Sequence, residues 1–248
     1  MSISAIITVH NRAPEISAAV SQSLLLPGNL PDELVVVLDR APYAVSEGAR
    51  KAYLGLDSAG VSVRIITLRG VGGWRNPVIA WNAGLRAASC DKVFCFSSET
   101  IQLAGNIRKA VSRLYTRQII LFGKTLCSCG SNGHAFKHDG RPAGNTISST
   151  ESPLPIGHIW AADRSVAKAT GGFDMAFSEG YGWEDADFFL RLWNLGIDFE
   201  FNDSISGLHI CHENQNRNIQ YDEIEQRIKT SVDVFLDRHG TINPWDKI

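Results

Sequence analysis

The sequence predicts an α/β domain in which a mostly parallel sheet has helices on both faces. Short runs rich in β-branched residues alternate with helical patterns through the first half of the chain. Of the 248 residues, 44% are hydrophobic, which is enough to bury a substantial core. Several of the predicted strands are followed directly by polar residues. Because ligands bind beyond the carboxyl ends of the strands in parallel α/β sheets, these polar residues are the first candidates for a site.

The first half contains a regular series of strands and helices. "ISAIITV" and "ELVVVLD" are apolar strands, and Pro14 with Glu15 suits the first turn of the helix between them. In order, the expected elements are a strand at 3–9, a helix at 14–26, a strand at 33–39, a helix at 43–58, a strand at 61–68, a helix at 77–88 and a strand at 92–97.

The second half is less regular. A stretch rich in Gly, Ser and Pro at 132–155 is typical of a surface loop. Around this loop, the expected elements are a strand at 117–129, a strand at 156–163, a turn at 171–177, a helix within 179–192, short strands at 199–201 and 205–210, and an amphipathic helix near 220–237. We find neither an internal repeat nor a linker, so we expect one domain over 1–248.

Composition excludes several classes of function. Lys and Arg number 24 against 26 Asp and Glu, and the net charge of -2 provides no field that gathers nucleic acid. The longest apolar runs are far shorter than the roughly 20 residues that span a bilayer, although contact with a membrane surface stays compatible with the sequence. Five cysteines form no disulfide framework and no secretion leader precedes the first strand, so we expect a cytoplasmic protein.

The segment "EGYGWEDADFFLRL" at 179–192 concentrates acidic residues at the start of an apolar helix. Helical spacing puts one set of polar side chains on a stripe that a solvated surface and the helix dipole explain, namely Glu184, Asp187, Arg191 and Asn194. Asp185 differs, because its neighbours three, four and seven residues on are apolar. A carboxylate on that face is either a helix cap bound to backbone donors or a functional group in a cleft, and the spacing alone favours neither.

Candidate metal ligands follow two other strands. Glu99 comes after the strand at 92–97, where a carboxylate can hold a divalent ion, although a solvent-exposed loop acid is the simpler explanation. His209 and His212 lie near the end of a short strand, and either could complete such a site through an imidazole nitrogen. Without other context, the favoured explanation is that one histidine lies at the surface and the other is packed in the core.

Other strand ends carry groups suited to a nucleotide. Asp39 could accept hydrogen bonds from a base or ribose, while Arg12 and Arg75 could meet phosphate. A separate group of thiols and imidazoles has a spacing that fits no standard zinc finger or ribbon, which makes a structural zinc site improbable: Cys127, Cys129, His134 and His138.

Four motifs, taken in chain order, resemble those of one enzyme family. "IITVHNR" and "ELVVVLD" are similar to its first two strands, and "GWRNPVIAWNAGLRAA" to its Gly-aromatic-Arg segment and Asn-x-Gly helix. The most specific match is "GGFDMAFSEGYGWEDADFFLRL", with a Gly-Gly-Phe-Asp turn and then Gly-Trp-Glu-Asp at the start of a helix. From Ile3 to about Asn214, the chain resembles GT-A fold nucleotide-sugar glycosyltransferases of the inverting family 2 and their galactosyl- and N-acetylgalactosaminyltransferase-like relatives.

The resemblance implies a Rossmann-like nucleotide-sugar-binding half at about 1–120, a smaller acceptor and catalytic half at about 121–215, and a C-terminal helical segment at about 216–248. It implies that Asp185 is the catalytic base, with Glu184 beside it on the sugar. Together with the phosphate contact expected of Arg12, it assigns the UDP-sugar to Thr8, Asn11, Arg12, Asp39, Arg75, Asn82 and Trp183. Mn²⁺ or Mg²⁺ would be held by Glu99 with His209 or His212.

Two departures from the family pattern affect this site. The Asp-x-Asp motif is Ser97-Ser98-Glu99 here, so its first acid is absent and its last, usually the direct metal ligand, is Glu99. Trp81 stands where many members have an arginine before the asparagine, which removes one phosphate contact.

The predicted function is transfer of a sugar from a UDP-sugar to a hydroxyl of a glycan or glycoconjugate, as in polysaccharide biosynthesis, with inversion at the anomeric carbon. Gly-Trp-Glu-Asp favours galactose or N-acetylgalactosamine as the sugar. The alternative is a non-catalytic GT-A domain that binds a nucleotide sugar or glycan within a complex. A nucleotidyltransferase is disfavoured, because no glycine-rich signature loop followed by a basic residue opens the chain.

Overall fold

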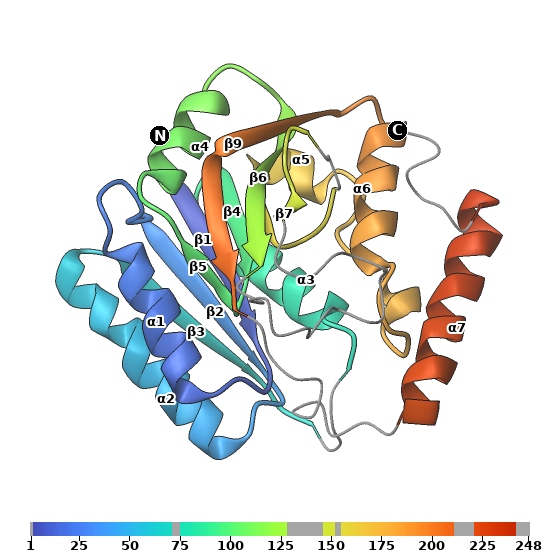
Figure 1. The fold of residues 1–248 in the computed structure, drawn as a ribbon, viewed down its shortest axis with the longest axis horizontal. Coiled ribbons are helices and arrows are strands. Elements are labelled where there is room, and N and C mark those ends of the chain that lie inside the picture. Colours follow the sequence, from blue (N-terminus) through green and yellow to red (C-terminus); the bar gives the residue numbers. More distant parts are fainter. Residues whose placement is uncertain (1, 71–74, 128–145, 152–154, 211–220, 242–248) are drawn as a thin grey trace.

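A single sheet runs through the described part of the protein. The computed structural model describes residues 2–70, 75–127, 146–151, 155–210 and 221–241. The strand order is β3-β2-β1-β4-β8-β6-β9-β5, with β7 paired to β6 (Figure 1). The strands are β1 (Ile3–Val9), β2 (Glu33–Asp39), β3 (Ser62–Leu68), β4 (Lys92–Ser97), β5 (Thr100–Gln102), β6 (Ile119–Cys127), β7 (Thr146–Ser148), β8 (Ile159–Asp163) and β9 (Asp198–His209).

Strands β1 to β4 form the parallel part of the sheet. β1 lies between β2 and β4, with Thr8 opposite Val37 on one side and Ser97 on the other. β2 is buried along its whole length, which explains its continuous apolar run. This register brings the carboxyl ends of β1, β2 and β4 to one edge of the sheet, so the polar residues that follow them lie close together.

The rest of the sheet is mixed. β8 runs antiparallel to both β4 and β6, β6 is parallel to β9, and β5 is antiparallel to β9. The start of β8 therefore lies beside the end of β4, where the backbone N–H of Ser97 donates to the carbonyl of His158 at 3.1 Å. At the other border, Thr100 of β5 lies opposite His209 of β9. Both histidines are thus brought to the edge where the parallel strands end.

Helices cover the two faces of the sheet, and each face has its own apolar core. The helices are α1 (Pro14–Leu24), α2 (Tyr43–Leu54), α3 (Val78–Ala87), α4 (Asn106–Arg113), α5 (Arg164–Lys168), α6 (Glu184–Asn194) and α7 (Tyr221–His239). One core contains Leu24 and Tyr53 from α1 and α2, and the other contains Trp81 and Phe188 from α3 and α6. Figure 1 shows α7 on the outer side of α6. Of the helices described, none has the length and apolar character needed to cross a membrane.

The predicted α/β class is confirmed, with a sheet that is parallel across the first half and mixed beyond it. Three short elements were not predicted from the sequence: β5, α4 and α5. β7 occupies part of the stretch predicted to be a surface loop. The two short strands expected at 199–201 and 205–210 are one strand, β9, because a shift in the β6–β9 register between Gly123 and Lys124 accommodates the polar residues between them.

The position of Asp187 corrects the prediction of a solvated stripe on α6. Its side chain is 0% exposed and accepts hydrogen bonds from Nε of Arg191 at 2.8 Å and Nη1 of Arg238 at 2.6 Å. Nε2 of His239 lies 3.0 Å from the same carboxylate. Since Arg238 and His239 belong to α7, this buried carboxylate joins α6 to the C-terminal helix.

Candidate functional site

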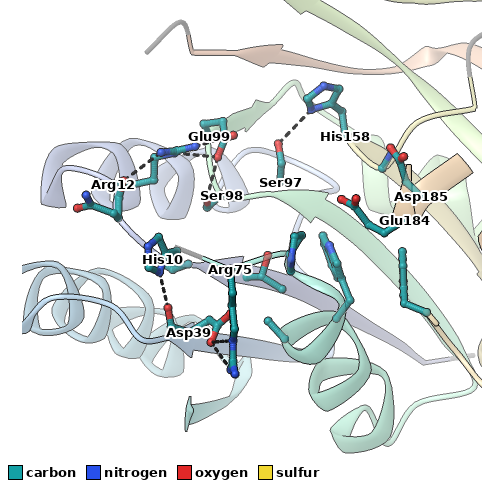
Figure 2. A pocket seen from close by; sticks show the side chains of 18 of the residues that line it. His10, Arg12, Asp39, Arg75, Ser97, Ser98, Glu99, His158, Glu184 and Asp185 are labelled. Carbon is teal, nitrogen blue, oxygen red and sulfur yellow. Dashed lines mark hydrogen bonds and ion pairs between the residues drawn. The ribbon is translucent and has the colours of Figure 1, made fainter. Parts of the chain in front are cut away.

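A cavity of about 270 Å³ lies at the carboxyl ends of β1, β2 and β4. This volume is at the lower end of the range, roughly 300–1,000 Å³, that is typical of small-molecule sites. Figure 2 shows charged side chains on two sides of it. We call the first the strand side, made of Arg12, Asp39, Arg75 and Glu99. The second is the helix side, made of Glu184 and Asp185 at the start of α6.

On the strand side, Asp39 forms an ion pair with Arg75 through two guanidinium nitrogens. Nε of Arg75 lies 3.0 Å from Oδ1 and 3.2 Å from Oδ2 of Asp39, and Nη2 lies 2.5 Å from Oδ1. Both side chains are largely buried, and both line the cavity. Nδ1 of His10 lies 2.6 Å from the backbone oxygen of Asp39 and further fixes this strand end. The acid and the arginine expected to meet a nucleotide are thus adjacent.

The other strand-side pair joins Arg12 to Glu99. Nε and Nη2 of Arg12 lie 3.2 Å and 3.3 Å from the two carboxylate oxygens. Glu99 is only 9% exposed, so the simpler explanation of a solvent-exposed loop acid is wrong. Thr8 and Asn11 also line the cavity beside Arg12.

One histidine lies next to Glu99, and a second packs against the first. Nε2 of His209, which is 2% exposed, lies 3.4 Å from Oε1 of Glu99. The ring of His158 packs edge-on against that of His209 with centroids 4.7 Å apart, and its Nδ1 lies 3.5 Å from Oγ of Ser97. Sequence reasoning missed His158, because only the antiparallel pairing of β8 with β4 brings it to the cavity. His212 lies outside the described residues.

On the helix side, Asp185 is held by backbone donors. Oδ1 accepts a hydrogen bond from the N–H of Ala186 at 2.8 Å, and Oδ2 from the N–H of Gly157 at 3.1 Å. Gly182 and Trp183 before the helix have φ angles of 73° and 63°, in the left-handed region that a tryptophan seldom adopts. Asp185 therefore combines contact with a helical N–H and a place on the cavity wall, the two roles that its sequence left open.

Glu184 has an environment that disfavours its charge. Its Oε2 accepts a hydrogen bond from Nδ2 of Asn76 at 2.8 Å. Burial, and then the charge of neighbouring Asp185, raise the pKa of Glu184 to about 7, while the bond from Asn76 opposes this rise. The neutral form of Glu184 is therefore favoured more than that of an ordinary exposed carboxyl group. Sequence reasoning did not single out Asn76, which follows Arg75 directly.

Two residues assigned to the donor have other described contacts. The side-chain amide of Asn82 donates to the carbonyl of Phe173 at 2.7 Å and accepts from its N–H at 2.9 Å. It thereby fixes the Gly-Gly-Phe-Asp turn, in which Gly172 has a φ of +94° and a Cβ would come within 2.4 Å of Oδ1 of Asn82. Trp183 packs, partly buried, against the core under α3 and α6. Their contact with a donor stays a prediction.

Trp81, which replaces the arginine of many family members, lines the cavity. Its ring stacks on that of Phe173, with centroids 6.1 Å apart and planes inclined by 19°. The residue thus contributes an apolar surface to the cavity wall.

The metal ligands expected from the sequence are only partly brought together. Glu99 and His209 lie side by side, but over the described stretches of the chain no group of three or more His, Cys, Asp or Glu side chains is arranged to hold an ion. The group of thiols and imidazoles that was disfavoured as a zinc site lies almost wholly outside the described residues, since only the backbone of Cys127 is included.

Comparison with known proteins gives one family match. Residues 149–213 match a family described as the N-terminal domain of galactosyltransferase. The matched segment contains the Gly-Gly-Phe-Asp turn, the Gly-Trp-Glu-Asp motif and both candidate metal-binding histidines. A search of curated protein sequences found no match.

Solved structures match over nearly the whole chain. The mannosyltransferase PcManGT from Pyrobaculum calidifontis, in complex with GDP-Man and Mn²⁺, has a TM-score of 0.65 at 15% identity, covering 100% of this chain and 67% of its own. S. aureus TarS 1-349 with UDP-GlcNAc has a TM-score of 0.64 at 13% identity, covering 96% and 67%. GalNAc-T7 with UDP, GalNAc and Mn²⁺ has a TM-score of 0.67 at 13% identity, and the chain covers 50% of its length. The protein therefore has the GT-A fold of nucleotide-sugar glycosyltransferases.

Proposed function

We propose that the protein is an inverting glycosyltransferase that moves a sugar from a UDP-sugar to a hydroxyl group of a glycan or glycoconjugate. The observation that supports this most directly is the two-sided cavity (Figure 2). Its strand side has the arginines that a diphosphate requires, and its helix side has the carboxylates that can accept a proton from a hydroxyl group. Inverting transfer of a sugar from a diphosphate to a hydroxyl group can use both kinds of group at one place.

Asp185 acts as the general base in this proposal. The N–H groups of Ala186 and Gly157 orient its carboxylate, which faces the cavity. The carboxylate takes the proton of the acceptor hydroxyl while that oxygen forms a bond to the anomeric carbon. The bond from this carbon to the UDP oxygen breaks on the opposite face, and its electron pair leaves with UDP. The configuration is inverted, and Asp185 ends the step protonated.

Glu184 supports this chemistry from the neighbouring position. Since its pKa is about 7, a large fraction of the molecules carries a neutral Glu184 at neutral pH. The neutral group can donate a hydrogen bond to a sugar hydroxyl, and it leaves the negative charge of the pair on Asp185. Two adjacent carboxyl groups with different protonation states are a recurrent arrangement in acid–base catalysis.

The strand side would hold the nucleotide. Asp39 would accept hydrogen bonds from the base or ribose, and Arg75 and Arg12 would face the phosphates, with Thr8 and Asn11 lining the same wall. The arginines would stabilise the charge that develops on UDP as it leaves. Both arginines line this wall.

The solved structures of PcManGT and GalNAc-T7 contain Mn²⁺, which raises the question whether a divalent ion fits this cavity. Part of the strand side has suitable ligands. Oε1 of Glu99 and Nε2 of His209 face each other at 3.4 Å, and this oxygen and nitrogen are suitable ligands for Mn²⁺, the oxygen also for Mg²⁺. Glu99 and one histidine, His209 or His212, would hold the ion, with phosphate oxygens completing its shell. When bound, the ion supplies positive charge against the leaving diphosphate.

One observation favours a second function, that of a non-catalytic GT-A domain. The first acid of the Asp-x-Asp motif is Ser97, and the remaining acid, Glu99, is paired with Arg12. Such a domain would bind a nucleotide sugar or glycan within a complex without releasing UDP. The two functions differ in this one product.

The experiment that tests the proposal has two stages. Thermal unfolding is first followed with a panel of UDP-sugars, including UDP-galactose and UDP-N-acetylgalactosamine, with and without Mn²⁺, because a true ligand raises the melting temperature by mass action. UDP release is then measured with the stabilising sugar and a set of glycan acceptors. Stabilisation with UDP release supports the transferase. Stabilisation without UDP release over the whole acceptor set favours the non-catalytic domain.

A further inference from the structure

The Arg12–Glu99 pair places a cation of the protein itself on the carboxylate that is expected to hold a metal (Figure 2). Arg12 follows β1, and its Nε and Nη2 lie 3.2 Å and 3.3 Å from Oε2 and Oε1 of Glu99, so both oxygens face the guanidinium group. Nη1 donates to the carbonyl of Asn11 at 3.0 Å. The two side chains are only 14% and 12% exposed, so water screens this pair less than a surface ion pair.

The other contacts of Glu99 fix its carboxylate in the same orientation. Oγ of Ser98 donates to Oε2 at 2.8 Å, and Nε2 of His209 lies 3.4 Å from Oε1. A divalent ion would need at least one of these oxygens as a direct ligand. It would also be repelled by a guanidinium group that stays on the same oxygens. Arg12 and a divalent ion therefore compete for one carboxylate.

We propose that Arg12 is a built-in cation that takes the place of the divalent ion in the nucleotide-free site, and that a nucleoside diphosphate binds there in the absence of metal. This rests on the proposed function, since it concerns the same ligand. A planar guanidinium group can face a carboxylate and a phosphate oxygen with different N–H groups. Arg75 has the equivalent place beside Asp39 on the same wall.

Calorimetric titration of UDP, with EDTA and then with Mn²⁺, tests this proposal. The affinity of the wild type is expected to change less than about threefold between the two conditions. Arg12→Gln is expected to lose about tenfold in EDTA, as for one charged hydrogen-bonding partner, and to recover part of the loss with Mn²⁺. Arg12→Lys keeps the charge and loses less. The matched control is Arg50→Gln on α2, outside the cavity wall, which binds like the wild type.

A second measurement titrates the protein with Mn²⁺ alone and detects the free ion by electron paramagnetic resonance. The nucleotide-free Arg12→Gln protein is expected to bind Mn²⁺ at least about threefold more tightly than the wild type, because Arg12 no longer occupies Glu99. Glu99→Gln in the same variant removes the gain. Melting curves establish that each variant is folded.

The outcomes separate this proposal from the proposed function. UDP binding by the wild type only with Mn²⁺ would overturn the role of Arg12 and leave the glycosyltransferase proposal standing, and so would equal affinities of Arg12→Gln and the wild type in EDTA. An unchanged Mn²⁺ affinity in folded Arg12→Gln would also overturn it, since no competition would exist. Absence of UDP binding under both conditions would overturn the proposed function, and the role of Arg12 with it.

Discussion

The two sides of the cavity hold their acidic residues in different ways. On the strand side each acid faces an arginine, in the pairs Asp39–Arg75 and Glu99–Arg12. On the helix side Asp185 accepts hydrogen bonds from backbone N–H groups, and Glu184 accepts one from Asn76. Each strand-side carboxylate has an opposite charge beside it, whereas the two helix-side carboxylates oppose each other's ionisation, as the raised pKa of Glu184 indicates.

The difference is that one side of the cavity presents balanced ion pairs, whereas the other presents two adjacent carboxyl groups. Balanced ion pairs give fixed positive groups that an anionic ligand can meet without altering protonation. A carboxyl group whose pKa lies near neutrality, as for Glu184, is suited to exchange a proton in that pH range. The following substitutions separate the two sides, from the largest expected effect to the smallest.

Asp185→Asn tests the helix side most strongly. Turnover is expected to fall by about 10²–10⁴-fold, the usual contribution of a general base, while the UDP dissociation constant changes less than about twofold. Steady-state UDP release and calorimetry measure the two quantities. Glu179→Gln, at an exposed acid of the same segment, is the control and keeps full turnover. Unchanged turnover in Asp185→Asn would show that the base lies elsewhere.

Asp187→Asn tests whether Asp187 stabilises the fold, in contrast to Asp185 on the same helix, for which a catalytic role is proposed. It is expected to lower the free energy of unfolding by about 3 kcal/mol, because Arg191 and Arg238 lose a buried partner. Urea unfolding measures this change. Asp233→Asn breaks an exposed ion pair with Lys229 on α7 and is expected to cost less than about 0.5 kcal/mol. Equal stability of the two variants would contradict a buried joint between α6 and α7.

Glu184→Gln tests the raised pKa through stability. The unfolded chain releases this proton near the ordinary pKa of 4.5 and the folded protein near 7, so the folded state binds more protons between these values. The free energy of unfolding of the wild type is therefore expected to fall, relative to Glu184→Gln, by about 2 kcal/mol from pH 5 to pH 8. Urea unfolding at both pH values gives this difference. A difference between the two proteins that is independent of pH would mean that Glu184 titrates normally.

Arg75→Gln probes the strand side. The UDP dissociation constant is expected to rise about tenfold, or about 1.4 kcal/mol, because Asp39 then repels the phosphates without a compensating charge. The turnover number at saturating donor is expected to change less than about threefold, which is the pattern of lost binding and not of lost chemistry. Arg69→Gln, at an exposed position after β3, is the control. A loss confined to turnover would reverse the assignment of the two sides.

Much of the fold could be predicted from local patterns. The strands β1, β2 and β4 are found where the apolar runs placed them, because burial on both faces requires continuous apolar residues. Prediction failed at short or irregular elements: β5 has three residues and was missed, and β9, predicted as two strands, contains polar residues that a register shift accommodates. In these cases tertiary pairing overrides a weak local signal.

The sequence predicted several residues of the candidate site, but not which of them contact one another. Asp39, Glu99 and Asp185 were singled out because acids follow strands or point to an apolar helix face, and all three line the cavity. Asn82 was assigned to the donor by its motif, yet its described contacts are to the turn at Phe173. The motif identified Asn82 as a residue of interest, but it did not show whether the side chain contacts a ligand or fixes a turn.

The sequence by itself determined the α/β class, the strands that carry the polar residues and the acidic start of α6, because these follow from the spacing of neighbouring residues. Only the tertiary structure decided which charges meet. Arg12 and Glu99 are 87 residues apart, and Asp39 and Arg75 are 36 apart. It also buried Asp187 between two helices and brought His158 to His209. Side-chain pairing depends on how strands are ordered in the sheet, and no local period of the sequence encodes that order.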